Sequence, residues 1–133
     1  MEYVLRTDRL TKLFGKRPAV NHVSMSVKKG DIYGFIGKNG AGKTTLIRMA
    51  VGLAAPSSGT IELFGSSDLK KQRHRIGTVI EYPAIFPHMT ARQNLEAQCR
   101  LIGVKDAKVI EDTLHLVGLD PAGKKKARNF ANV

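Results

Sequence analysis

Apolar and polar residues alternate in the first part of the chain. Across residues 23–27 the apolar side chains are separated by serines, which is the pattern of a strand with one buried face. An earlier strand is predicted over residues 3–10, and a turn at residues 15–18 joins the two. Residues 2–27 therefore predict antiparallel β structure.

Two later runs are short and largely apolar. Residues 32–36 and residues 76–80 have the length and composition of buried strands. A further strand is predicted over residues 60–64, after a turn rich in proline and serine at residues 54–59. Because helical segments lie between and after these runs, we expect an α/β fold.

Apolar residues recur at helical spacing in three segments. The first segment covers about residues 43–52 and ends at a glycine. The second begins at the capping box formed by Thr90 and Gln93 and stops at a glycine at residue 103, and the third covers about residues 106–118. The apolar positions of the first helix are Leu46, Ile47, Ala50, Val51 and Leu53, and the core candidates of the other two are Leu95, Leu101, Ile102, Val109, Ile110, Leu114 and Val117.

A glycine-rich loop lies between the first apolar run and the first helix. Residues 37–44 read GKNGAGKT and fit the pattern G-x-x-x-x-G-K-[ST] in the strand–loop–helix context that it requires. Glycines allow successive backbone N–H groups to point at phosphate oxygens, and the start of the helix adds its own N–H groups and the positive end of its dipole. The alternative is a glycine turn before an ordinary surface helix, which the flanking elements disfavour.

The loop assigns a role to each polar group. Lys43 can reach the β- and γ-phosphates, the Thr44 hydroxyl can ligate Mg²⁺, and Thr45 lies near the α-phosphate. ATP and Mg²⁺ are therefore the expected ligands. The predicted nucleotide-binding residues of the loop are Gly37, Lys38, Asn39, Gly40, Ala41, Gly42, Lys43, Thr44 and Thr45.

Composition narrows the class of protein. With 133 residues and 42% apolar content the chain is one domain at most, and no apolar run approaches the ~18 residues of a membrane span. A single cysteine, Cys99, excludes an internal disulfide and fits a reducing compartment. The net charge is +11, concentrated at residues 70–75 and 124–128. A solvated surface explains it best, ahead of a membrane contact, and nucleic acid is not expected because the clusters lack interleaved aromatics.

Residues 10–65, from LTKLFGKRP to GTIELFG, resemble the opening of an ABC-transporter nucleotide-binding domain nearly residue for residue. The resemblance implies a P-loop NTPase fold with an N-terminal antiparallel β-subdomain and the start of a helical subdomain. It also implies that Phe14 stacks on the adenine ring. By composition alone an aromatic residue at this place would more often be part of the core.

Glu81 stands where most members of that family have a glutamine. The glutamate and its surroundings are similar to the exporters that protect bacteria from lantibiotics and bacitracin. The resemblance implies that Glu81, with Thr44, helps to hold Mg²⁺, since a carboxylate is a suitable ligand. The alternative is a surface glutamate at the end of a strand.

The resemblance covers nearly the whole chain, but the chain covers only about the first half of the family's domain. We expect residues 1–86 to form the nucleotide-binding core with its β-subdomain, and residues 87–133 to begin the helical subdomain. The family's signature sequence, its Walker B carboxylates and its switch histidine have no match in this chain. No catalytic site is therefore complete here, and the runs at residues 32–36 and 76–80 are expected to have open edges.

By resemblance, the chain is the N-terminal part of the ATP-binding subunit of an ABC exporter, with peptide antibiotics as candidate substrates. Its expected partners are ATP, a transmembrane subunit and a second copy of the full-length ATP-binding subunit, at the cytoplasmic face of the membrane. The alternatives are a non-hydrolytic nucleotide-binding fragment or regulator, and an ABC protein without membrane subunits that acts on ribosomes or DNA. The reading frame beyond Val133 discriminates between them.

Overall fold

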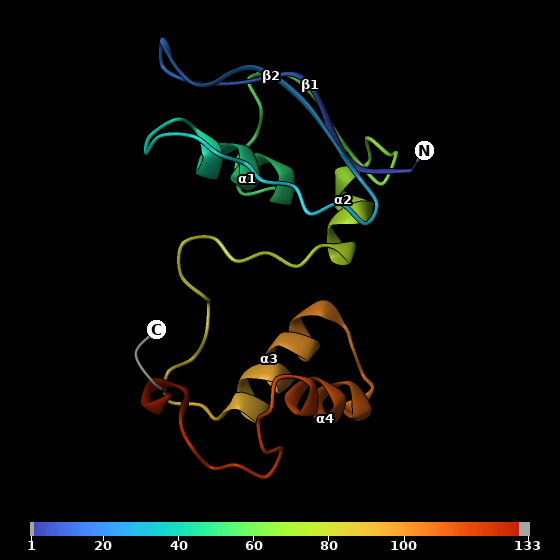
Figure 1. Ribbon diagram of the computed structural model, residues 1–133, viewed down its shortest axis with the longest axis vertical. Coiled ribbons are helices and arrows are strands. Elements are labelled where there is room, and N and C mark those ends of the chain that lie inside the picture. The colour runs from blue at the N-terminus through green and yellow to red at the C-terminus, as the bar shows by residue number, and fades with distance from the viewer. Residues whose placement is uncertain (1, 131–133) are drawn as a thin grey trace. The chain divides into compact units, whose positions relative to one another are not determined.

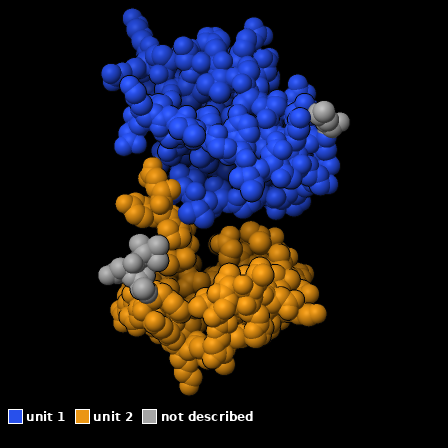
Figure 2. Space-filling model, viewed as in Figure 1, with its two compact units in different colours: residues 1–80 blue, residues 81–133 orange. Residues whose placement is uncertain are grey.

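The computed structural model describes residues 2–130. They form two compact units, one ending at Ile80 and the other beginning at Glu81, which are coloured separately in Figure 2. The expected boundary between a nucleotide-binding core at residues 1–86 and the start of a helical subdomain at residues 87–133 stays a prediction. Among the described residues, no helix has both the length and the apolar character that crossing a membrane would require.

The first unit is built on a three-stranded antiparallel sheet of order β2-β1-β3 (Figure 1). Its strands are β1 (Tyr3–Phe14), β2 (Arg17–Lys28) and β3 (Ser58–Leu63). The antiparallel N-terminal structure predicted from the sequence is confirmed. The first strand continues to Phe14, beyond the predicted end at residue 10, because the hairpin pairing extends to the two-residue turn.

Two buried threonines stabilise an irregular stretch of this hairpin. The pairing of β1 with β2 shifts register between Thr7 and Leu10, and Arg9 and His22 have positive φ angles of 43° and 50°. The Thr7 hydroxyl donates to the Val23 carbonyl at 2.9 Å and accepts from an amide, and the Thr11 hydroxyl accepts from the His22 amide at 3.0 Å. The hydroxyls thus satisfy backbone groups that the bulged ladder leaves unpaired.

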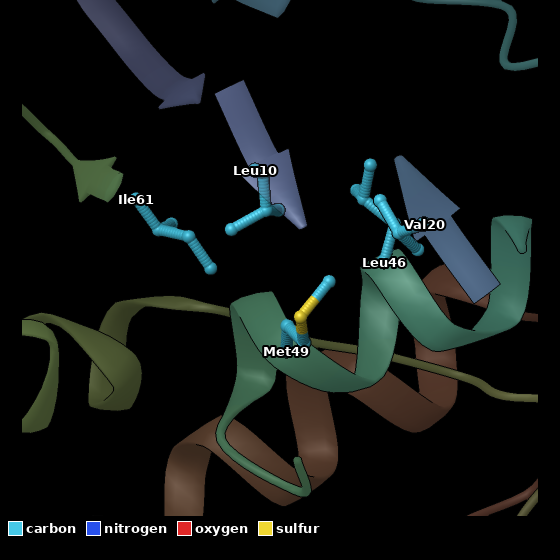
Figure 3. Packing of buried hydrophobic residues seen from close by; sticks show 5 residues of the cluster. All are labelled: Leu10, Val20, Leu46, Met49 and Ile61. Atoms are coloured by element: carbon cyan, nitrogen blue, oxygen red, sulfur yellow. The ribbon is translucent and has the colours of Figure 1, made fainter. Parts of the chain in front are cut away.

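Helix α1 (Lys43–Val51) covers the inner face of the sheet. Figure 3 shows the side chains of Leu46 and Met49 pointing from the helix toward residues of the strands. The helix and the strands share a buried hydrophobic cluster, which consists of Leu10, Val20, Leu46, Met49 and Ile61. Within this cluster Leu10 and Met49 are fully buried. The core therefore fixes α1, and with it the loop that precedes α1, against the sheet.

A short helical stretch closes the far end of α1. It consists of α2 (Leu69–Gln72) and the 3₁₀ turn η1 (Arg73–Arg75). The Arg73 Nε donates to the Ala50 carbonyl at 3.3 Å, and its guanidinium lies against Gly52, which ends the helix. The Arg75 guanidinium stacks over the Phe64 ring at 3.7 Å. The Arg73 guanidinium thus lies at the C-terminal end of α1, where the helix dipole is negative and a cation is stabilising.

The two apolar runs predicted to be buried strands are not strands in this structure. Residues 32–36 and 76–80 have no place in the sheet formed by the described residues. Ile32 and Ile36 are fully exposed, and Val79 is largely exposed. The physical reason is that a strand needs neighbours that pair its backbone groups along its length, and within residues 2–130 these runs have no such pairing beyond a single bridge at Ile80.

The second unit contains α3 (Ala91–Ile102), α4 (Ala107–Leu116) and the 3₁₀ turn η2 (Ala127–Asn129). The capping box predicted at Thr90 and Gln93 is present, with both reciprocal hydrogen bonds. Arg92 pairs with the Glu111 carboxylate and donates through Nε to the Pro121 carbonyl at 2.9 Å. These contacts fasten the first turn of α3 to α4 and to the chain that follows it.

The apolar stripe of the second unit is narrower than predicted. Ile110 and Leu114 are buried as expected. The prediction is wrong for four other core candidates, whose side chains are exposed, because among the described residues α3 and α4 pack against each other and leave their remaining faces open to solvent. The exposed candidates are Leu101, Ile102, Val109 and Val117.

Candidate functional site

Gly42 fixes the junction between the glycine-rich loop and α1. It is the N-cap residue, with a left-handed φ of 93° that a side chain strongly disfavours. A Cβ added there would collide with the carbonyl oxygen of Ala19, on β2, and would lie 3.2 Å from Val20. Only glycine lets the loop approach the sheet this closely.

The start of α1 is left available to an anion. The first four amides of a helix have no intrahelical acceptor, and no side chain caps them at Gly42. The first turn contains no acidic residue, so no carboxylate competes for its N–H groups. The helix dipole adds positive potential at the same place. This end of α1 therefore favours an oxyanion.

The Lys43 side chain curls back over the loop. Its ammonium donates to the carbonyl oxygens of Gly37 and Lys38, the latter at 2.8 Å. A Cβ on Gly37 would lie 3.6 Å from the same nitrogen. An ammonium has three N–H donors, so this arrangement fixes the position of the charge above the loop and leaves a donor for a ligand.

The remaining loop residues complete a tight turn. The Ala41 amide donates to the Lys38 carbonyl at 3.1 Å, and Asn39 and Gly40 are exposed at its tip. Thr44 and Thr45 are half-buried in the first turn of α1. The structure brings all nine predicted loop residues together, and their roles as ligands stay predictions.

Phe14 ends β1 and is 60% exposed. It pairs with Arg17, two residues before Ala19 on β2, whose carbonyl meets Gly42. With ~3.3 Å per residue along a strand and ~5 Å between paired Cα atoms, Phe14 lies on the order of 10 Å from the loop. Figure 1 shows the β1–β2 turn and the loop before α1 extending toward the same side of this unit. An aromatic platform and an anion site thus share one end of the sheet.

Glu81 belongs to the other compact unit. Its φ of 64° is unusual for a residue with a side chain. The predicted role of Glu81 as a Mg²⁺ ligand together with Thr44 stays a prediction. Among residues 2–130, no group of three or more His, Cys, Asp or Glu side chains could hold a metal ion by itself. A cation at Thr44 would therefore need oxygen ligands from a bound phosphate or from water.

Sequence reasoning missed two contributors to this site. Lys12 places its ammonium 5.4 Å from the centre of the Phe14 ring. Lys12 and Phe14 are two positions apart on β1, so their side chains point to the same face of the strand. This spacing is the sequence signal that could have predicted the contact. The Ala19 carbonyl lies against Gly42 through a contact that is distant in sequence, and no local pattern announces it.

Comparison with known proteins identifies relatives for nearly the whole chain. The sequence profile of the family described as ABC transporter matches residues 20–132. The bacitracin transport ATP-binding protein BcrA of Bacillus licheniformis is 42% identical over 98% of this chain, which is 44% of BcrA. The lantibiotic transport ATP-binding protein SrtF of Streptococcus pyogenes is 32% identical over 96% of this chain and 56% of its own length.

Solved structures agree with these relatives. A nucleotide-free ATP-binding cassette from an ABC transporter superposes with a TM-score of 0.77 at 27% identity. The match covers 98% of this chain and 60% of that one. The chain thus spans about half of the length of the sequence relatives that it matches.

Proposed function

The chain belongs to the ABC transporter family, and from that premise we propose that it binds ATP on residues 37–45 as part of the ATP-binding subunit of a membrane transporter. The observation that carries the proposal is the start of α1, which no side chain caps. Gly42 lets the loop approach the sheet there, and the Lys43 ammonium is held over the loop by the Lys38 carbonyl. A bound ATP would contribute phosphate charge and a transferable phosphoryl group. The residues of this chain bind and orient that charge.

Each part of the site has a distinct task in this proposal. The N–H groups of the loop and of the first turn of α1 donate to phosphate oxygens, and Lys43 neutralises charge on the β- and γ-phosphates. Phe14 provides an exposed aromatic face for the adenine, at a distance from the loop that a nucleoside can bridge. Thr44 and Glu81 would hold Mg²⁺ between them with phosphate oxygens.

The transport role extends the proposal to the whole protein. The relatives BcrA and SrtF are named for the transport of bacitracin and lantibiotics. We therefore propose export of a peptide antibiotic, with a transmembrane subunit and a second ATP-binding subunit as partners at the cytoplasmic face of the membrane. The identities of 42% and 32% support this class of substrate.

Calorimetric titration of Mg-ATP into the full-length protein that carries this sequence tests the binding site. Lys43→Ala should weaken binding by at least tenfold, since it removes a charge-assisted contact of about 1.5–3 kcal/mol. Lys70→Ala is the matched control, because this exposed lysine lies on α2 outside the loop. Equal affinities for Lys43→Ala and the unchanged protein would overturn the assignment.

The metal role of Glu81 has its own test. A carboxylate near phosphate oxygens needs an intervening cation, so ATP affinity should depend more strongly on Mg²⁺ in the unchanged protein than in Glu81→Gln. ATP is titrated into both proteins with and without Mg²⁺. An equal dependence on Mg²⁺ would place Glu81 outside the metal site.

A further inference from the structure

The connection between α1 and β3, residues 53–57, is anchored at its start to the end of the helix. The Leu53 and Ala54 amides both donate to the Arg48 carbonyl, at 2.8 and 3.2 Å. The helix is in turn fixed to the sheet by the buried Leu46 and Met49. The position of this connection is therefore set by the same helix that begins at the phosphate loop.

The other end of the connection is fastened to the end of β1. The Ser57 amide donates to the Thr11 carbonyl at 2.9 Å, and the Ser57 hydroxyl accepts from the Leu13 amide at 2.9 Å. The Lys12 ammonium donates to the Ala55 carbonyl at 2.6 Å. Three consecutive residues of β1, all immediately before Phe14, are thus bonded to the connection.

Lys12 has a second contact, with Phe14 itself. Its ammonium lies 5.4 Å from the ring centre, within the range of a cation–π interaction. Because the same nitrogen is held by the Ala55 carbonyl, it covers one face of the ring from a fixed position. The Phe14 residue is 60% exposed, so much of the ring remains accessible to a flat ligand.

We propose that Lys12 is a positioning residue for the adenine platform, joining the Phe14 ring through residues 53–57 to the helix that carries the phosphate loop. The inference rests on the proposed function, because it concerns how Phe14 meets a base. In this proposal Lys12 acts through Phe14, since its ammonium contacts the Phe14 ring and the Ala55 carbonyl. Its loss should therefore weaken the binding of a nucleotide only while Phe14 is present to stack on the base.

A double-mutant cycle on the full-length protein tests the proposal, with ADP and Mg²⁺ as the probe and calorimetry as the readout. Lys12→Met keeps the aliphatic stem and should weaken ADP binding by roughly three- to tenfold, a part of the value of base–aromatic stacking. In a Phe14→Ala protein the same change should have no further effect. Lys12→Arg should retain affinity, since a guanidinium can both donate to Ala55 and stack on the ring.

Two further variants serve as a control and as an independent route to the same readout. Lys28→Met is the charge-matched control, because this exposed lysine pairs with Tyr3 at the opposite end of the hairpin. Ser57→Ala removes the acceptor of the Leu13 amide and should weaken ADP binding in the same Phe14-dependent way. It carries the test alone if circular dichroism shows that Lys12→Met does not fold.

The outcomes separate the two proposals. An unchanged ADP affinity in Lys12→Met, or an equal loss with and without Phe14, would overturn the positioning role while ADP binding that depends on Lys43 still supports the proposed function. No ADP binding by the unchanged protein, or binding that Lys43→Ala does not affect, would overturn the proposed function and the positioning role together.

Discussion

The backbone conformation of two single residues shapes the glycine-rich loop. Gly40 and Gly42 both have left-handed φ angles, of 81° and 93°. They differ in their surroundings: nothing lies within 4 Å of a Cβ added at Gly40, whereas one at Gly42 would meet the Ala19 carbonyl. The pair therefore separates conformational strain from steric collision.

Gly40→Ala should lower the free energy of unfolding by about 1–2 kcal/mol, which is the strain of a left-handed backbone at a residue with a side chain. Gly42→Ala should cost more than that, because the loop must also move away from β2, and it should abolish nucleotide binding. Thermal unfolding and ATP titration of both variants check this. Equal losses of stability would mean that the contact with Ala19 has no energetic weight.

Among the elements, α3 is held to the preceding turn by hydrogen bonds at its N-terminal end. The Asn94 side chain accepts from the Phe86 amide at 2.7 Å and donates to the carbonyls of Phe86 and Thr90, at 3.1 and 3.0 Å. It therefore ties the turn before the helix to the helix itself. The capping box at Thr90 and Gln93 acts on the same turn.

Asn94→Ala should destabilise the second unit by roughly 1.5–4.5 kcal/mol, because the three hydrogen bonds named above are lost at about 0.5–1.5 kcal/mol each. Gln98→Ala is the control, because Gln98 is exposed and lies one turn further along the same helix. This change should have little effect on stability. Chemical denaturation followed by circular dichroism measures both. Indistinguishable midpoints for the two variants would show that the turn does not depend on Asn94.

The elements also show where sequence reasoning succeeds. The limits of α1, α3 and α4 depend on residues that act locally: Gly42 and Gly52 bound α1, the capping box at Thr90 and Gly103 bound α3, and Asp106 caps the start of α4. The predictions for the three helices are confirmed. The residues of the glycine-rich loop are contiguous, so the sequence alone could bring them together, while their roles as ligands stay predictions. The strands predicted at residues 32–36 and 76–80 depend on neighbours distant in sequence, so their apolar composition alone could not place them.

At the scale of the whole molecule, the exposed apolar runs dominate the expected behaviour of the 133-residue chain on its own. Ile32 and Ile36 are fully exposed, and burying one such side chain is worth about 1.5–3 kcal/mol. The chain alone should therefore self-associate. Ile32→Ser combined with Ile36→Ser should reduce that association, as light scattering can measure. A compact monomer of the unchanged chain would contradict this expectation.

The isolated chain should also have negligible ATPase activity. The resemblance places the groups that orient the attacking water, and the signature that closes the site, outside these residues, and such groups contribute several factors of ten in rate. Phosphate release is compared between the chain and its Lys43→Ala variant. Turnover above that variant would show that the catalytic groups lie within the 133 residues.

The contact of Arg73 with Gly52 constrains the order in which substitutions can accumulate. A methyl group at residue 52 would strike the guanidinium, which can move only by leaving the Ala50 carbonyl. Gly52→Ala should therefore cost about 0.5–1.5 kcal/mol less after Arg73→Ala than before it, the value of that hydrogen bond. Substitutions at these two positions are therefore epistatic: alanine at residue 52 costs less once the arginine has been lost, while the left-handed φ of 89° disfavours it in both backgrounds.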